Sequence, residues 1–256
     1  MAVDELQVLK NARAKYFKIE KAKKINTNSE VLEEYDNWYY YNFCYYYYKK
    51  RTTILSLLNE LLGEELSLYF HLPTVRYKVA SENGNISGLV SKDIKNKKLE
   101  YHYATELPPE QFVHIDNMLT FNSPGDPLLK EQLTAYMFRG LYSALRDRYN
   151  NAIYATDADH PFILPPSLDY ESAFIDPFKH TYQDPIMLVS LTYIQEIKRN
   201  NPYYDKYLKM TEDLDIEKLL HNVSKKKKIL IPEHAIEYYH QFDSDRKTYL
   251  KGAGLN

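Results

Sequence analysis

Residues 133–174 carry the most informative pattern in the sequence. An apolar, helix-like run, Leu133–Leu145, leads directly into Arg146-Asp147-Arg148-Tyr149-Asn150-Asn151. A small apolar segment and a polar turn follow, and a second apolar run, Phe162–Leu168, then leads into Asp169-Tyr170-Glu171-Ser172. The predicted order is therefore a helix, a segment with acidic and amide side chains, a hairpin, and a second acidic segment. That order suits phosphoryl transfer, which uses one Asp beside the attacking hydroxyl and an Asn and an Asp to hold magnesium.

Composition narrows the class of protein. The net charge of -2 gives no electrostatic argument for binding nucleic acid or an anionic membrane. No apolar run is long enough to span a bilayer, and the N-terminus lacks an apolar signal core. Cys44 is the single cysteine, so an intrachain disulfide is impossible and a reducing compartment fits. We expect a cytoplasmic protein that binds neither membranes nor nucleic acid directly.

The N-terminal third predicts one short strand and a long helical region. Residues 14–20 alternate in polarity as a strand does. Residues 29–62 contain neither proline nor glycine, which favours one long helix or two in succession, with Gly63 as the stop. The aromatic run at 39–48 could equally form a strand. The apolar residues of 54–62 recur at helical spacing.

The remaining elements are read from turn and cap signals. Asn83-Gly84, between two alternating segments, predicts a tight hairpin turn. A further strand is expected at 99–104, and the boundary between a mixed part and a mostly helical part near 81–121. Residues 177–183 are expected to form a loop, and the lysine run 225–228 a solvated loop or helix end. The helices expected after residue 183 are 185–199, 202–210, 216–225 and 232–250.

The two polar segments resemble the catalytic centre of the HipA-like kinases, a family of bacterial serine/threonine kinases. The family pattern is roughly D-R-H-x-x-N, a hairpin, and an apolar run that ends in Asp. The hairpin at 77–90 with the exit Ser91–Ile94, and the C-terminal segments 215–220 and 231–232, are also similar to the family. The resemblance implies an α+β, protein-kinase-like fold with two lobes. Residues 1–105 would form a small mixed α/β N-lobe, and residues 106–256 a mostly helical C-lobe.

The resemblance also implies roles for individual residues. Asp147 would be the catalytic base, and Arg148 would position it or a neighbouring phosphate. Asn151 and Asp169 would be the magnesium ligands, with Asn150 as the alternative to Asn151. ATP and Mg²⁺ would be the cofactors. The partner would be a protein substrate or a regulatory protein.

The sequence departs from the family pattern at several positions. Tyr149 replaces the His, and Tyr170-Glu171 follows the metal-binding Asp in place of a small residue. No Gly-rich loop occurs in the first 60 residues. Lys18 is the candidate for the lysine that contacts the nucleotide phosphates, although it could equally be a solvated lysine. The glutamate that pairs with this lysine could be Glu33, Glu34 or Glu60.

These departures keep two other hypotheses open. The first is a catalytically impaired pseudokinase that acts as a binding or regulatory module. The second is a structural helical domain in which the motif occurs by chance.

Overall fold

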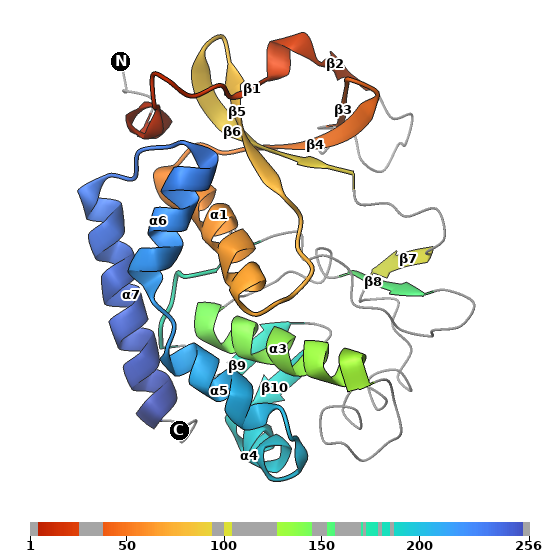
Figure 1. Cartoon of the computed structure of the whole chain (residues 1–256), viewed down its shortest axis with the longest axis vertical. Coiled ribbons are helices and arrows are strands. Elements are labelled where there is room, and N and C mark those ends of the chain that lie inside the picture. The colour runs from red at the N-terminus through yellow and green to blue at the C-terminus, as the bar shows by residue number, and fades with distance from the viewer. Residues whose placement is uncertain are drawn as a thin grey trace.

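The structure is a computed structural model that describes residues 5–25, 38–93, 100–103, 127–144, 153–156, 170, 173–178, 181–184 and 187–252. Figure 1 shows a curled sheet at one end of the molecule with helix α1 (Ile54–Tyr69) packed beneath it. Helices α6 (Ile216–Lys227) and α7 (Glu233–Gly252) run along one side. Helix α3 (Pro127–Ser143) and its neighbours fill the other end.

The larger sheet has six strands in the order β1-β5-β6-β4-β3-β2. β1 runs parallel to β5, and every other pair of neighbours is antiparallel. Helix α1 connects β4 to β5 along the chain, so it follows four strands of this sheet and precedes two. The strands are β1 (Phe17–Lys18), β2 (Lys23–Lys24), β3 (Trp38–Tyr41), β4 (Cys44–Lys50), β5 (Tyr77–Glu82) and β6 (Asn85–Lys92).

The aromatic run forms a β-hairpin, so the alternative of a strand at 39–48 is correct and the long helix from residue 29 is wrong. Asn42 and Phe43 both have positive φ, as a two-residue hairpin turn requires. Aromatic rings pair across the two strands, with Trp38 and Tyr47 at 5.2 Å between centroids. Cross-strand aromatic contacts stabilise sheets, and their sum outweighs the absence of helix breakers.

Helix α1 begins where the sequence supplies a cap. The Thr53 hydroxyl accepts a hydrogen bond from the Ser56 N–H and satisfies one free donor of the first turn. The helix then continues through Gly63 to Tyr69, so the prediction that Gly63 stops it is wrong. The turn that follows contains His71 at positive φ.

The predicted hairpin at Asn83-Gly84 is confirmed. β5 and β6 pair from Tyr77 opposite Ser91 to Glu82 opposite Asn85, with one register shift between Ala80 and Ser81. Both turn residues have positive φ, which Asn and Gly adopt at low cost. The strand expected at 14–20 is shorter than predicted, because β1 is followed at once by the 3₁₀ helix η2 (Ile19–Lys21).

The C-terminal part is mostly helical, as predicted. The helices among its described residues are α3, α4 (Leu191–Asn200), α5 (Tyr204–Glu212), α6 and α7. The loop predicted at 177–183 and the helix predicted from 185 are wrong in part, because β9 (Thr181–Asp184) and β10 (Met187–Ser190) form an antiparallel pair there. The strand predicted at 99–104 is present as β7 (Glu100–Tyr103), and it pairs with β8 (Ile153–Thr156).

One hydrophobic core joins the sheet to the helical part. It includes side chains of the 3₁₀ helix η1 (Glu5–Leu9), of α1, of β5 and β6, and of α3, α5, α6 and α7. The predicted boundary between residues 105 and 106 lies outside the described residues. Among the described helices, none is both long and apolar enough to cross a bilayer.

Candidate functional site

A buried ion pair connects the sheet to α1. The Lys49 Nζ lies 2.9 Å from the Glu60 Oε1, with the two side chains 10% and 0% exposed. Arg51 places its Nη2 2.5 Å from the same oxygen. Glu60 therefore has two cations beside it, which offset the cost of burying its charge.

Local sequence explains why these groups meet. Lys49 is the penultimate residue of β4, and the Thr53 cap starts α1 four residues later. Gly88 of β6 lies against the end of β4, where an added Cβ would fall 2.1 Å from the Lys49 carbonyl oxygen. Glycine at this position lets the last residues of β4 approach β6 closely, and so sets the direction of Lys49.

The other oxygen of Glu60 binds the second polar segment. Glu60 Oε2 accepts a hydrogen bond of 3.1 Å from the backbone N–H of Tyr170, the residue after Asp169. One carboxylate thus contacts both Lys49 and the backbone next to the predicted metal-binding Asp. The contact places Tyr170, the residue after Asp169, beside the Lys49–Glu60 pair.

Tyr170 is fixed at three further points. Its ring packs on Gly63, where a Cβ would lie 2.0 Å from the Tyr170 Cγ. Its hydroxyl forms a short hydrogen bond with Ser67 of α1. It also accepts a hydrogen bond of 2.9 Å from the Arg139 Nη1 of α3. All four side chains or backbones are buried, so Gly63 is needed for the approach of a ring and not for ending a helix.

The flanks of the two polar segments are also joined. The Phe174 N–H donates to the Ser143 carbonyl oxygen at 2.8 Å, which brings the end of α3 to the chain that follows 169–172. Arg246 of α7 donates to the carbonyl oxygens of Leu141 and, at 2.9 Å, Pro177. Burial lowers the pKa of Arg246 to about 10, so the guanidinium stays charged at neutral pH.

Most of the predicted site residues lie outside the described residues. This applies to Asp147, Arg148, Asn151 with its alternative Asn150, and Asp169, so their predicted roles stay predictions. Lys18, the fifth, is described: it is exposed in β1 and pairs with Ser81 of β5. Of the three glutamates considered, Glu33 and Glu34 fall outside the described ranges and Glu60 is the buried one. Within those ranges no cluster of His, Cys, Asp and Glu could hold a metal ion.

Sequence reasoning missed Lys49. The available signal was its position at the end of an alternating aromatic segment, followed at once by a capped amphipathic helix that carries Glu60. Reading that segment as helix hid the signal, because two residues eleven positions apart in one helix are separated by about 16 Å and cannot form an ion pair. In protein kinases the phosphate-binding lysine lies on a strand and its glutamate partner on helix αC. Lys49 on β4 and Glu60 on α1 have that relation.

One comparison with known proteins bears on the class of fold. No family model and no curated protein matches the sequence. Among solved structures, the chain is similar to the crystal structure of the Helicobacter pylori proinflammatory kinase CtkA, with a TM-score of 0.50 and 13% sequence identity. The match covers 83% of this chain and 90% of that one. The fold is therefore α+β and protein-kinase-like, with a curled N-terminal sheet and one helix before a helical C-terminal part.

Proposed function

We propose that this protein is a HipA-like protein kinase, which transfers the γ-phosphate of ATP to a serine or threonine of a protein. The observation that carries the proposal is the Glu60 carboxylate, which contacts Lys49 and the backbone N–H of Tyr170 together. An ion pair between a strand lysine and a helix glutamate is a part that protein kinases need for activity. The residue that precedes Tyr170 is the candidate magnesium ligand, Asp169.

Each residue then has a role in the proposed reaction. Lys49, and not Lys18, would contact the nucleotide phosphates, because Lys49 is the lysine paired with a helix glutamate. Asn151 and Asp169 would hold Mg²⁺, which neutralises charge that develops on the phosphate oxygens. The Asp147 carboxylate would accept the proton of the attacking hydroxyl, while Arg148 holds Asp147 or a phosphate in place.

The test is transfer of labelled γ-phosphate from ATP by the purified protein. Lys49→Met should lower the transfer rate by about a hundredfold or more, since it removes a charge that stabilises the transition state. It should leave the fold intact, because Arg51 still faces Glu60. Lys50→Met is the matched control, a neighbouring lysine that is exposed.

Three further variants complete the experiment. Asp147→Ala and Asp169→Asn should abolish transfer, and Lys18→Met should leave it unchanged. Undiminished transfer by Lys49→Met, or by Asp147→Ala, would refute the assigned roles. Loss of transfer in Lys18→Met alone would return the phosphate-binding role to Lys18.

A pseudokinase is the second candidate, and one observation favours it. The connection between β2 and β3, residues 25–37, contains no glycine, whereas kinases cover the phosphates with a Gly-rich loop. A pseudokinase would show no transfer to any protein. Binding of ATP and Mg²⁺ without transfer would raise the free energy of unfolding by about 2.7 kcal/mol at 100 times the dissociation constant, and a thermal melt would detect it.

A further inference from the structure

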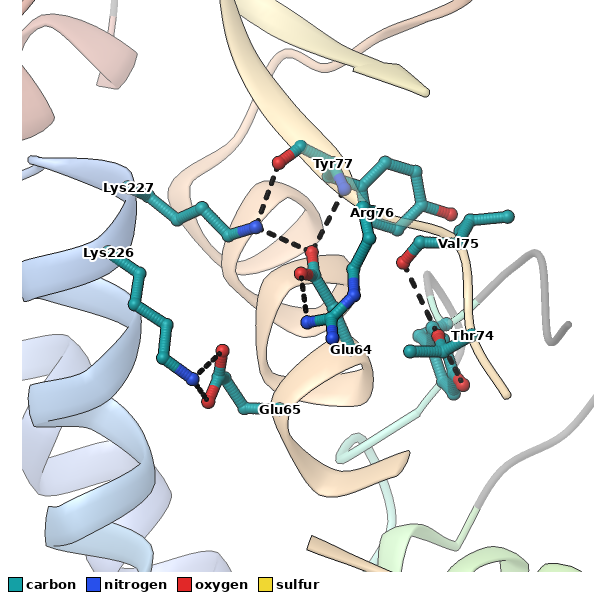
Figure 2. Close-up of polar contacts among 9 residues, drawn as sticks. Glu64, Glu65, Thr74, Val75, Arg76, Tyr77, Lys226 and Lys227 are labelled. Carbon is teal, nitrogen blue, oxygen red and sulfur yellow. Dashed lines mark hydrogen bonds and ion pairs between the residues drawn. The ribbon is translucent and has the colours of Figure 1, made fainter. Parts of the chain in front are cut away.

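Two lysines of α6 bind the helix that carries Glu60. Lys227 Nζ lies 2.6 Å from the Glu64 Oε2, with the side chains 9% and 2% exposed. Lys226 Nζ contacts both oxygens of Glu65, at 2.9 and 2.6 Å. Figure 2 shows the two lysines reaching from α6 toward the two glutamates of α1. The lysine run therefore ends a helix as expected, but Lys226 and Lys227 are not merely solvated.

Lys227 joins three elements at one point. It also donates a hydrogen bond of 2.8 Å to the carbonyl oxygen of Tyr77 in β5. The Tyr77 N–H in turn donates to the Glu64 Oε2 at 3.0 Å (Figure 2). The Glu64 carboxylate is thus held by α6 and β5 together, which fixes the rotation of α1 about its own axis.

That rotation decides where Glu60 points. Glu60 and Glu64 are four residues apart, so they project from the same side of α1 in successive turns. A rotation that withdraws Glu64 from Lys227 would also carry Glu60 away from Lys49. A second contact holds the same part of α1. The Tyr239 hydroxyl of α7 donates a hydrogen bond of 2.7 Å to the Asn59 Oδ1. Asn59 is the residue before Glu60.

We propose that Lys227 is a positioning residue, which acts through Glu64 to hold Glu60 against Lys49. The last two helices of the chain thereby set the geometry of the nucleotide site from outside it. This inference rests on the proposed kinase function for its effect on ATP, but not for its effect on α1. Lys226 reinforces it through Glu65 from the exposed side of the same interface.

The first experiment measures the affinity for ATP and Mg²⁺ by calorimetry. Lys227→Met should weaken binding by about tenfold, the effect of losing one well-formed polar contact. Lys225→Met changes an exposed lysine two residues earlier in α6 and should leave the affinity unchanged. In a Lys49→Met background, Lys227→Met should have no further effect, because both substitutions disable one pair. The proposal would be overturned if the effects of Lys49→Met and Lys227→Met on the binding free energy were fully additive. Equal affinity in Lys227→Met and Lys225→Met would overturn it as well.

A second experiment works without nucleotide. Hydrogen exchange of the free protein should be faster in residues 54–69 of Lys227→Met, and unchanged in α3 and α5. Faster exchange throughout the protein would mean loss of stability only and would overturn the positioning role. If the wild type binds no ATP, the proposed kinase function fails, and this experiment still decides whether Lys227 holds α1.

A charge exchange covers the case in which Lys227→Met does not fold. Lys226→Glu places two carboxylates together and should speed exchange in α1, because like charges repel. Glu65→Lys combined with Lys226→Glu should restore the slow exchange of the wild type. Absence of any restoration would overturn the coupling of α6 to α1.

Discussion

α1 and α3 both contact Tyr170 and both bury charged side chains, but the charges have opposite sign. α1 buries the carboxylates of Glu60, Glu64 and Glu65. α3 buries the guanidinium of Arg139, which is 0% exposed. Every buried carboxylate of α1 has a cation from another element within ion-pair distance, from the end of β4 or from α6. Among the described contacts, Arg139 donates to the hydroxyls of Ser67 and Tyr170 and lies against the Tyr136 ring.

Among the described contacts, α1 is held by ion pairs to other elements, whereas α3 meets Ser67 and Tyr170 through hydrogen bonds from Arg139. Each of these ion pairs joins two elements, so removing one partner leaves a buried charge. Removing one hydrogen bond to a hydroxyl, or one contact with a ring, costs less free energy of unfolding. Substitutions in α1 should therefore cost more than those around α3, and the cost should follow the number of partners.

The largest effect is expected from Glu60→Gln. Lys49 and Arg51 would face each other without a carboxylate, and breaking a buried pair costs about 3–5 kcal/mol in free energy of unfolding. Urea denaturation measures the loss. Glu237→Gln, on the exposed side of α7, is the control and should be nearly neutral. A Glu60→Gln protein as stable as the Glu237→Gln control would refute the expectation that α1 depends on its ion pairs.

Gly63→Ala should come next. In an unhindered helix this change stabilises by about 1 kcal/mol. Here the new Cβ would lie 2.0 Å from the Tyr170 Cγ, so we expect a loss of about 1–3 kcal/mol instead. The control is Gly252→Ala in α7, where no atom lies within 4 Å of the added Cβ. Equal signs for the two changes in thermal melts would show that Tyr170 does not press on α1.

Tyr170→Phe removes one hydroxyl from between the two helices. Ser67 and Arg139 would each lose a hydrogen bond inside the core, at a cost of about 1–2 kcal/mol. Tyr45→Phe, which changes an exposed hydroxyl, should be neutral. We expect Tyr170→Phe to lower the free energy of unfolding by less than Glu60→Gln does, when both are measured by urea denaturation.

The smallest effect is expected at the solvated pair of α3. Glu131 binds Lys206 of α5, and that hydrogen bond holds the pKa of Glu131 below its usual value. A depressed carboxyl pKa stabilises above the unfolded pKa, and the contribution disappears as the pH falls through the folded pKa. Glu131→Gln should therefore cost less than about 1 kcal/mol at neutral pH and nothing in strong acid. A loss that persists in acid would point to packing instead of charge.

Much of the secondary structure was predictable because its signals are local. Asn83-Gly84 specifies its turn through the conformations that these two residues allow. Asp215 caps α6 through a hydrogen bond to the Lys218 N–H, three residues away. The aromatic strands were ambiguous, because a run of tyrosines packs as well on a helix as on a sheet. Only the pairing of β3 with β4 decided between them.

The site was predictable in part. The order of Asp147, Asn151 and Asp169 is a property of the sequence, and it led to the expectation of a protein-kinase-like fold that the structural comparison supports. Glu60 was one of three candidates that the sequence could not separate. Lys18 was predicted to contact the nucleotide phosphates instead of Lys49. Both are lysines near aromatic strand-forming residues, and nothing local distinguishes them.

The sequence by itself determined the turns, the helix caps and the order of the acidic and amide groups, since each depends on residues a few positions apart. The tertiary structure alone decided which lysine meets which glutamate, why a glycine lies in the middle of α1, and what the lysine run binds. Those outcomes join residues 11 to 163 positions apart. Their partners are chosen by the packing of the sheet, α1 and α6 around one core, and no spacing along the chain records that choice.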